Sequence, residues 1–187
     1  MKSAKKILAL ILAGVMALAL LTRCGKATSP DRAVAETIAD WIKYNCSQSK
    51  NTNKISVSYQ VPELSRNIVP LFDTNWMKRD DNADSDDPDY PDENAVISGT
   101  TTVADALQQC LSNYTDASSI VFYATDVTGE ANLVSVETVK LLLMSKPVVV
   151  SGEPNEALKN ITHVRIATTH KTIGEQTFLL AVVIFEA

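Results

Sequence analysis

Hydrophobic residues follow two different periods along this chain. They recur at helical spacing in 30–46, 101–114 and 135–145, whereas 161–169 alternates and 177–187 is almost continuously apolar. Helical spacing gives a segment one apolar face, and alternation is typical of a strand with one face against a core. The pattern therefore predicts an α/β domain.

Residues near the ends of these segments sharpen the helix predictions. Ser29 is expected as an N-cap with Pro30 at the first helical position, and Ser135 as the N-cap of a later helix. A further helix is expected over 62–72, which Pro70 should kink or end. The residues expected to face the core are Val34, Ile38, Trp41, Ile42, Cys46, Leu64, Ile68, Leu71, Phe72, Val103, Leu107, Cys110 or Leu111, Tyr114, Val136, Val139, Leu142 and Leu143.

Short extended segments are expected between the helices. The residue types favour strands at 55–59, 118–127 and 147–150, a short helix over 153–160, and a closing hairpin that turns at 173–175. The last strand is apolar on both faces and must be covered on both. We therefore expect a three-layer α-β-α sandwich, whose small mixed or antiparallel sheet ends in a C-terminal hairpin.

The amino terminus has the pattern of an export signal. Lys2, Lys5 and Lys6 precede an apolar run of fifteen residues, 7–21. A basic stub followed by such a run is typical of a secretory signal peptide, and the run is short for a permanent membrane span. We expect residues 1–23 to be this signal.

The residues after the run resemble the lipobox of bacterial lipoproteins. Leu21 lies three positions before Cys24, the expected site of lipid attachment, although Arg23 occupies a position that normally holds a small residue. The alternative is ordinary cleavage near Ala27, which leaves a secreted protein. The expected organisation is a lipoprotein-type signal, a tether over 24–30 and a single domain over 31–187, anchored to the cell membrane and facing outside.

Charge and cysteine content limit the expected partners. Four of the 17 basic residues precede Cys24, which leaves 13 against 22 acidic residues and a formal charge of −9. An acidic domain without a basic cluster argues against nucleic acid as a partner. Cys46 and Cys110 could pair in an oxidising compartment or remain two separate buried thiols. Their spacing does not indicate zinc, and we expect neither a metal nor a cofactor.

Residues 78–94 form a strongly acidic stretch with eight acidic side chains and two prolines. Asp81, Asp84, Asp86 and Asp89 raise the alternative of a calcium site, because calcium takes several oxygen ligands from one loop. The glycine and the terminal glutamate of an EF-hand loop are not found in register. A like-charge run with prolines is more typical of a solvated loop.

The order of segments resembles the CAP superfamily, the SCP-like extracellular domains that include cysteine-rich secretory and plant pathogenesis-related proteins. The similarity is colinear over 31–187. It is carried by "ISVSYQVPELSRNI" (55–68), "GTTTVADALQQCL" (99–111), "SVETVKLLLMS" (135–145), "ITHVRIA" (161–167) and "TFLLAVVIF" (177–185). The resemblance implies an α-β-α sandwich and an exported binding or scaffold protein.

The chain departs from this family at the cavity residues. CAP domains with the full signature place two histidines and two acidic residues around a cleft, but 85–100 and 144–160 contain no histidine here. Ser118 or Ser119 stands where one of the acids is expected. His163 matches a strand histidine that lies outside the cavity. No cavity residue can therefore be carried over, and we assign no catalytic residue.

The two histidines are expected to be structural. His163 should share a strand face with Arg165, opposite Val164 and Ile166, as a partly exposed side chain. His170 should lie near the hairpin turn in solvent. A histidine base needs an orienting partner and a nucleophile, and the sequence identifies neither.

Three hypotheses of function follow. The first is a lipid-anchored, non-catalytic CAP-like domain that binds a cell-surface or small apolar ligand. The second is a calcium- or glycan-dependent interaction protein that uses the acidic loop. The third is a hydrolase that uses carboxylates such as Glu130, Glu137 or Glu153. We favour the first.

Overall fold

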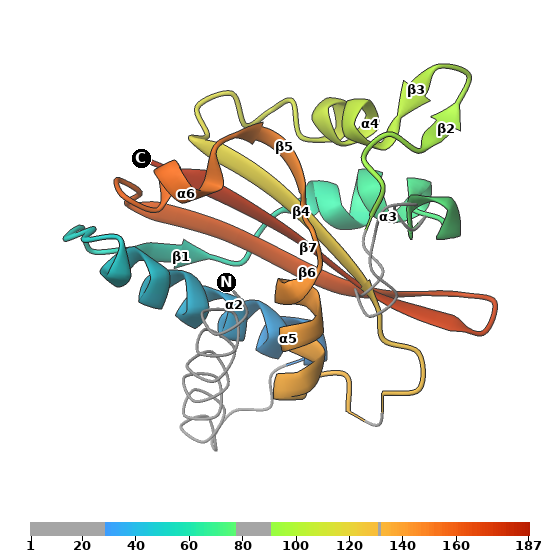
Figure 1. Ribbon diagram of the computed structural model, residues 1–187, viewed down its shortest axis with the longest axis horizontal. Helices are drawn as coiled ribbons and strands as arrows, with labels where there is room; N and C mark the ends of the chain where they lie inside the picture. The colour runs from blue at the N-terminus through green and yellow to red at the C-terminus, as the bar shows by residue number, and fades with distance from the viewer. Residues whose placement is uncertain (1–28, 78–90, 131) are drawn as a thin grey trace, which may run out of the picture.

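The computed structural model describes residues 29–77, 91–130 and 132–187. It contains a five-stranded sheet and a separate pair of short antiparallel strands, together with helices, and the predicted mixed α/β class is confirmed (Figure 1). In chain order the elements are α2 (Pro30–Gln48), β1 (Ser56–Ser58), the π-helix η1 (Leu64–Ile68), α3 (Val69–Leu71), the 3₁₀-helix η2 (Thr74–Met77), β2 (Val96–Ser98), β3 (Thr101–Thr102), α4 (Val103–Cys110), β4 (Ser119–Asp126), α5 (Val136–Met144), β5 (Val148–Gly152), α6 (Pro154–Ala157), β6 (His163–Ile173) and β7 (Gln176–Glu186).

The five-stranded sheet has the order β1-β6-β7-β4-β5. β1 runs parallel to β6, and all other neighbours in the sheet are antiparallel. β6 and β7 form the predicted closing hairpin, which is paired from His163 with Glu186 to Ile173 with Gln176. β7, the most apolar strand, therefore lies in the middle of the sheet.

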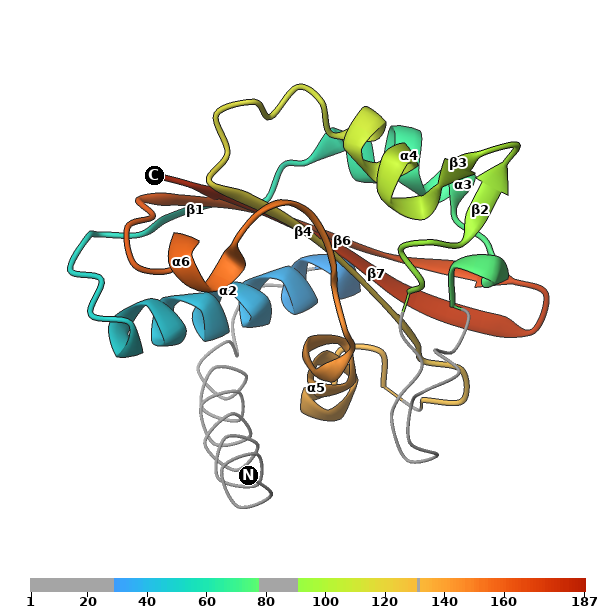
Figure 2. The ribbon, with the colours of Figure 1, turned by 45° about the horizontal axis from the view of Figure 1, so that its top comes forward.

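Successive residues of the central strands contribute to two different hydrophobic clusters. Val121 and Tyr123 of β4 lie in the cluster that contains residues of α2, α5 and α6. Phe122 and Ala124 lie in the cluster that contains residues of η1, η2 and α4. Helices accordingly lie on both sides of the sheet (Figure 2), as the two apolar faces of β7 require.

The predicted helix starts are confirmed. The Ser29 side chain accepts a hydrogen bond from the Arg32 backbone N–H at 3.3 Å, and Pro30 is the first residue of α2. Ser135 caps α5 by accepting from the Thr138 N–H at 3.0 Å. Side-chain caps of this kind satisfy backbone donors that have no partner within the helix.

The segment 62–72 is helical but irregular. The Val69 N–H donates to the Leu64 carbonyl, five residues back, so the first part is a π-helix. Pro70 lacks a backbone N–H and cannot donate to the preceding turn, which accounts for a departure from α geometry here. Leu64, Ile68 and Phe72 are buried as expected, whereas Leu71 is 42 % exposed and its predicted core position is wrong.

The two cysteines do not form a disulfide. Cys46 is buried in the cluster beneath α2, and Cys110 packs against the cluster on the opposite side of the sheet. Of the two sequence alternatives, separate thiols are confirmed, but only Cys46 is buried, and Cys110 is half-buried. Burial raises the pKa of both thiols, which favours their neutral form.

Several predictions lie outside the described residues. These are the signal peptide 1–23, the lipid site Cys24 and the acidic residues of 78–90, which include Asp81, Asp84, Asp86 and Asp89. None of the helices in the described ranges combines the length and the hydropathy needed to cross a membrane.

Candidate functional site

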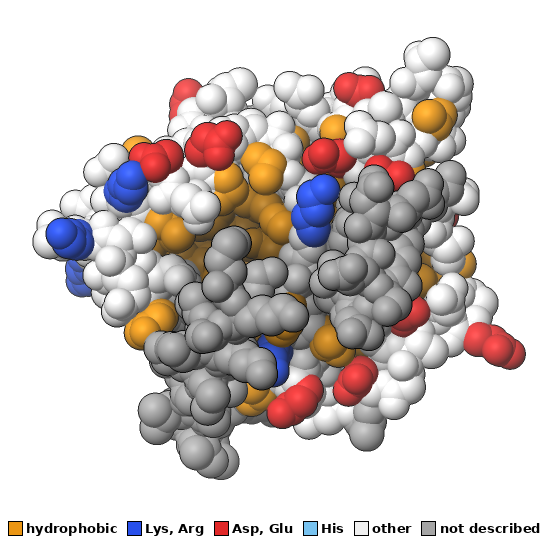
Figure 3. Space-filling view, viewed as in Figure 1, with side chains coloured by type: hydrophobic (Ala, Val, Ile, Leu, Met, Phe, Trp, Pro, Cys, Tyr) orange, Lys and Arg blue, Asp and Glu red, His pale blue; other side chains and the backbone are white. Residues whose placement is uncertain are grey.

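A groove of about 440 Å³ lies along the outer edge of β6, and we call it the β6 groove. It is lined by Asp31, 59–62, Leu64, Ser65 and 167–169. These residues come from the start of α2, the segment that follows β1, the π-helix and β6. A second hollow, in which hydrophobic side chains gather, lies beside α6 and β5 (Figure 3).

The groove exists because β1 is much shorter than β6. Ser56, Val57 and Ser58 pair with 163–165, and no other strand of the described residues pairs with β6 on that side. The chain turns away at Tyr59 to reach the π-helix. The outer edge of β6 is therefore left without a neighbouring strand from Ile166 to Ile173.

The hydrogen-bond register shows which backbone groups face this open edge. The Ser56 N–H donates to the Thr162 carbonyl at 2.9 Å, beside the pairing of Ser56 with His163. In such a ladder, even-numbered residues of β6 direct their backbone groups toward β1 and odd-numbered residues toward β7. Beyond the part that β1 covers, the N–H and C=O groups of Thr168, His170 and Thr172 therefore face the open edge.

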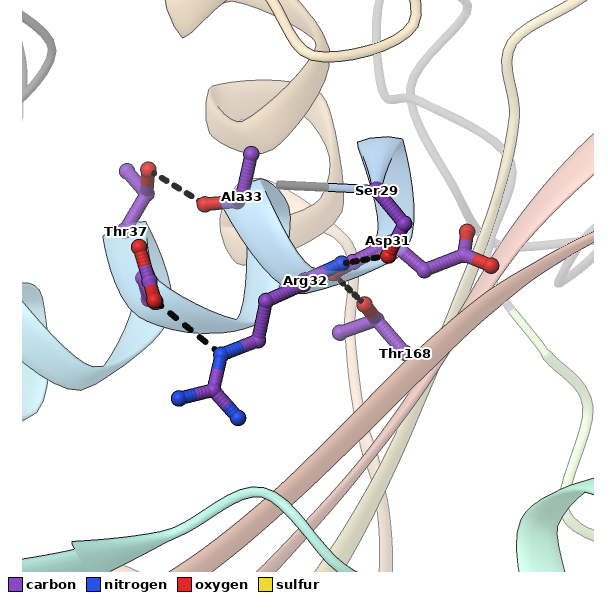
Figure 4. A network of polar contacts seen from close by, with 7 residues as sticks. Ser29, Asp31, Arg32, Ala33, Thr37 and Thr168 are labelled. Carbon is purple, nitrogen blue, oxygen red and sulfur yellow. Dashed lines mark hydrogen bonds and ion pairs between the residues drawn. The ribbon is translucent and has the colours of Figure 1, made fainter. Parts of the chain in front are cut away.

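The first turn of α2 forms one side of the β6 groove. The Thr168 hydroxyl donates to the Asp31 carbonyl at 2.5 Å, and the Asp31 carboxylate lies 2.6 Å from His170 Nδ1. A carboxylate can only accept, so Nδ1 carries the proton of this hydrogen bond. Figure 4 shows Thr168 reaching the start of α2 next to the Ser29 cap. Two contacts thus hold the helix start against β6.

Tyr59 lines the groove at the end nearest β1 and contacts Arg32 of α2. The Arg32 guanidinium lies 3.3 Å from the centre of the Tyr59 ring, a stacked cation–π arrangement. Arg32 Nε also donates to Glu36 at 3.0 Å along α2. The guanidinium is therefore held by a ring and a carboxylate on two different elements.

The other side of the groove is fixed through Lys171. Its ammonium group donates to the carbonyls of Val69 and Phe72, both at 2.5 Å. Phe72 packs edge-to-face on Phe178 of β7, with ring centroids 5.3 Å apart. These contacts join α3, which directly follows the π-helix, to the hairpin, so both sides of the groove are attached to the hairpin.

The sequence prediction for His170 was wrong. We expected a solvated residue near the hairpin turn, but β6 extends to Ile173 and the His170 side chain is only 14 % exposed. Asp31, 139 positions away, shields it and accepts a hydrogen bond from its Nδ1–H. A contact over this distance in the sequence leaves no local pattern.

The prediction for His163 is confirmed. Val164 and Ile166 are fully buried, while His163 and Arg165 lie on the other face as partly exposed side chains. His163 Nδ1 is 2.6 Å from the Ser56 hydroxyl, and Nε2 is 3.9 Å from Glu186. Glu186 instead accepts from Arg165 Nε at 2.8 Å.

Neither histidine presents a free ring nitrogen to solvent, since each Nδ1 is hydrogen-bonded. Nε2 of both rings is buried and has no hydrogen-bond partner among the described residues. A base must reach the proton that it removes, and these nitrogen atoms do not reach solvent. The two imidazoles therefore serve as internal contacts of β6.

The carboxylates considered for hydrolysis are dispersed. Glu130 lies after β4, Glu137 in the first turn of α5 and Glu153 before α6, and all three are exposed. Within the described residues, no group of three or more His, Cys, Asp or Glu side chains is placed to hold a metal ion.

Comparison of the chain with protein-family models, curated proteins and solved structures found no match.

The residues that line the β6 groove were not predicted from the sequence. One usable signal was the run from Ala167 to Thr172, "ATTHKT", where the hydrophobic alternation of β6 stops. Polar and small residues on both faces of a strand are consistent with an edge that no helix or strand fully covers.

Proposed function

We propose that this protein is exported, anchored to the outer face of the cell membrane through lipid at Cys24, and non-catalytic. In this proposal the domain over 31–187 binds a cell-surface partner through the β6 groove. The observation that carries the binding role is the open edge of β6 between two braced sides. The basic stub and apolar run before Cys24 support export.

The resemblance of the sequence to the CAP superfamily supports a binding domain. The order helix, short strand, helix, and closing hairpin is that of the family motifs, and hydrophobic residues cover both faces of the sheet. The family's cavity residues are not in the sequence. The binding site is therefore placed at the β6 groove, with the hydrophobic hollow beside α6 and β5 as the surface for a small apolar ligand.

Lipid attachment is tested by growing a bacterial host that expresses the full chain with an alkyne-labelled fatty acid. Cys24→Ser should abolish labelling and release the protein from the membrane fraction. Cys110→Ser, which changes a half-buried thiol of α4, is the control and should keep the label. Arg23→Ala should increase the labelled fraction because a small residue then precedes the cysteine. Equal labelling of the Cys24→Ser protein would contradict the proposed anchor.

Binding through the β6 groove is tested with tagged protein and isolated cell envelopes. Ser65→Trp fills the groove from an exposed position of the π-helix, whereas Arg66→Trp adds the same ring at an exposed position that does not line it. Ser65→Trp should lower envelope binding by about tenfold, a loss typical of blocking a small site, and Arg66→Trp should not. Unchanged binding by Ser65→Trp would contradict the assigned site.

A further inference from the structure

We propose that the β6 groove accepts an extended, uncharged or basic segment of another polypeptide, which pairs with β6 as an added edge strand. This inference rests on the proposed function only in taking the groove as the binding site. It specifies the class of partner and the way in which that partner is recognised.

The backbone of β6 supplies the recognition. Thr168, His170 and Thr172 direct their N–H and C=O groups to an edge that no strand of the described residues covers. An extended peptide carries donors and acceptors with the same two-residue period, so it can pair with Thr168 inside the groove and continue along His170 and Thr172 beyond the groove lining. Strand addition gives affinity through main-chain hydrogen bonds, and side-chain pockets then give specificity.

The shape of the groove favours one strand over a second sheet. Asp31 borders it on one side, and Leu64 and Ser65 of the π-helix border it on the other. Both sides are fixed to the hairpin through His170 and Lys171. A second copy of this chain would bring its own two groove sides to the same edge, whereas a single extended segment has none.

The charge of the groove favours an uncharged or basic segment. Asp31 is the charged residue of its lining, and its side chain is 43 % exposed. The neighbouring cations face other partners, since Arg32 stacks on Tyr59 and Lys171 binds two carbonyl oxygens. An acidic segment would meet the carboxylate of Asp31, whose side chain is partly exposed and whose neighbour His170 contributes one hydrogen bond. The small side chains of Ala167 and Thr169 leave space for larger side chains of the incoming segment.

The test measures fluorescence anisotropy of a fluorescein-labelled, capped heptapeptide with the sequence Lys-Val-Thr-Val-Thr-Val-Lys, titrated with the full chain in detergent micelles. We expect saturable binding that Ser65→Trp lowers by roughly tenfold or more and Arg66→Trp leaves within about twofold. Two N-methylated versions of the peptide identify the mode. Methyl groups on one alternate set of backbone nitrogens should lower affinity by roughly tenfold, because that set donates to β6, and those on the other set should have little effect.

Three results would overturn the inference. The first is no binding of the peptide by the unmodified chain. The second is equal loss of affinity for both N-methylated peptides, which would show contact without strand pairing. The third is a dimer in sedimentation that Ser65→Trp dissociates, which would place a second copy in the groove. If the peptide fails but Ser65→Trp still lowers envelope binding, only this inference is wrong; if envelope binding is also unaffected, the proposed site fails with it.

Discussion

The two ends of β6 differ in how the outer edge and the polar side chains of the strand find partners. At the His163 end, β1 covers the strand edge and the polar side chains bind one another, with Ser56 against His163 and Arg165 against Glu186. At the His170 end no strand of the described residues covers the edge, and His170 instead binds the first turn of a helix.

This difference explains where a binding surface can form. An edge strand that is already paired has no backbone groups to offer, while an unpaired edge exposes a regular row of them. In this protein the unpaired half is bordered by α2 and by the π-helix, and the β6 groove lies between them. Substitutions at the two ends of β6 should therefore have different effects on binding.

The largest expected effect on stability comes from the aromatic side chains that pack near the open end of β6. Phe178 is 1 % exposed, lies opposite Lys171 in the hairpin and packs on Phe72. Phe178→Ala should lower the free energy of unfolding by about 3–5 kcal/mol because it leaves a large cavity. Urea denaturation measures this loss. A change below about 1 kcal/mol would mean that the site collapses or that the ring is not packed as described.

Phe185→Ala is the matched change at the paired end, opposite Val164. It removes a ring that is 4 % exposed and should also be strongly destabilising. The folded variant should keep peptide binding, because Phe185 lies beside the β1-covered part of β6. Loss of binding by folded Phe185→Ala protein would remove the distinction between the two ends.

The histidines provide the next comparison. His170→Ala should lower stability by about 1–2 kcal/mol, because it removes a mostly buried ring and its hydrogen bond to the half-exposed Asp31. His163→Ala should cost less than about 1 kcal/mol, since its hydrogen bond to Ser56 is exposed and its contact with Glu186 is long and partly exposed. Thermal unfolding at neutral pH measures both. His163→Ala should also leave ligand binding intact, and a tenfold loss would reveal a site that the strand assignment missed.

The smallest expected effect is a change in the alkaline titration of Tyr114, near the paired end of β6. Burial and the Glu63 carboxylate, 2.6 Å from the Tyr114 hydroxyl, raise the pKa of Tyr114 well above its ordinary value. Burial alone raises the pKa of Tyr123 to about 12. Glu63→Gln should therefore lower the pKa of Tyr114 and leave Tyr123 unchanged, as followed by phenolate absorbance. An unchanged Tyr114 titration would show that Glu63 does not act on it.

The raised pKa values of Tyr114 and Tyr123 should also make stability fall at alkaline pH. A tyrosine whose pKa is higher in the folded state stabilises that state fully below its ordinary pKa, about 10. For Tyr123 this contribution should be lost as the pH rises from about 10 to about 12. Denaturation midpoints across this range should fall accordingly.

The sequence predicted the individual helices and strands better than the contacts between them. Helix starts at Ser29 and Ser135 and the alternation around Val164 are local signals, and each led to the observed structure. The contact of Asp31 with His170, and the short pairing of β1, depend on segments more than 100 residues apart. No periodicity encodes such distances, so the β6 groove could not be located before the fold was known.

The most direct test of the open edge is residue-resolved amide hydrogen exchange of β6. Thr168, His170 and Thr172 should exchange rapidly, while Ala167, Thr169 and Lys171, whose N–H groups point to β7, should be protected. An alternating pattern past Ile166 that is not found at the β1-covered end would support the account. Uniform protection along the whole strand would show that the edge is covered and would contradict it.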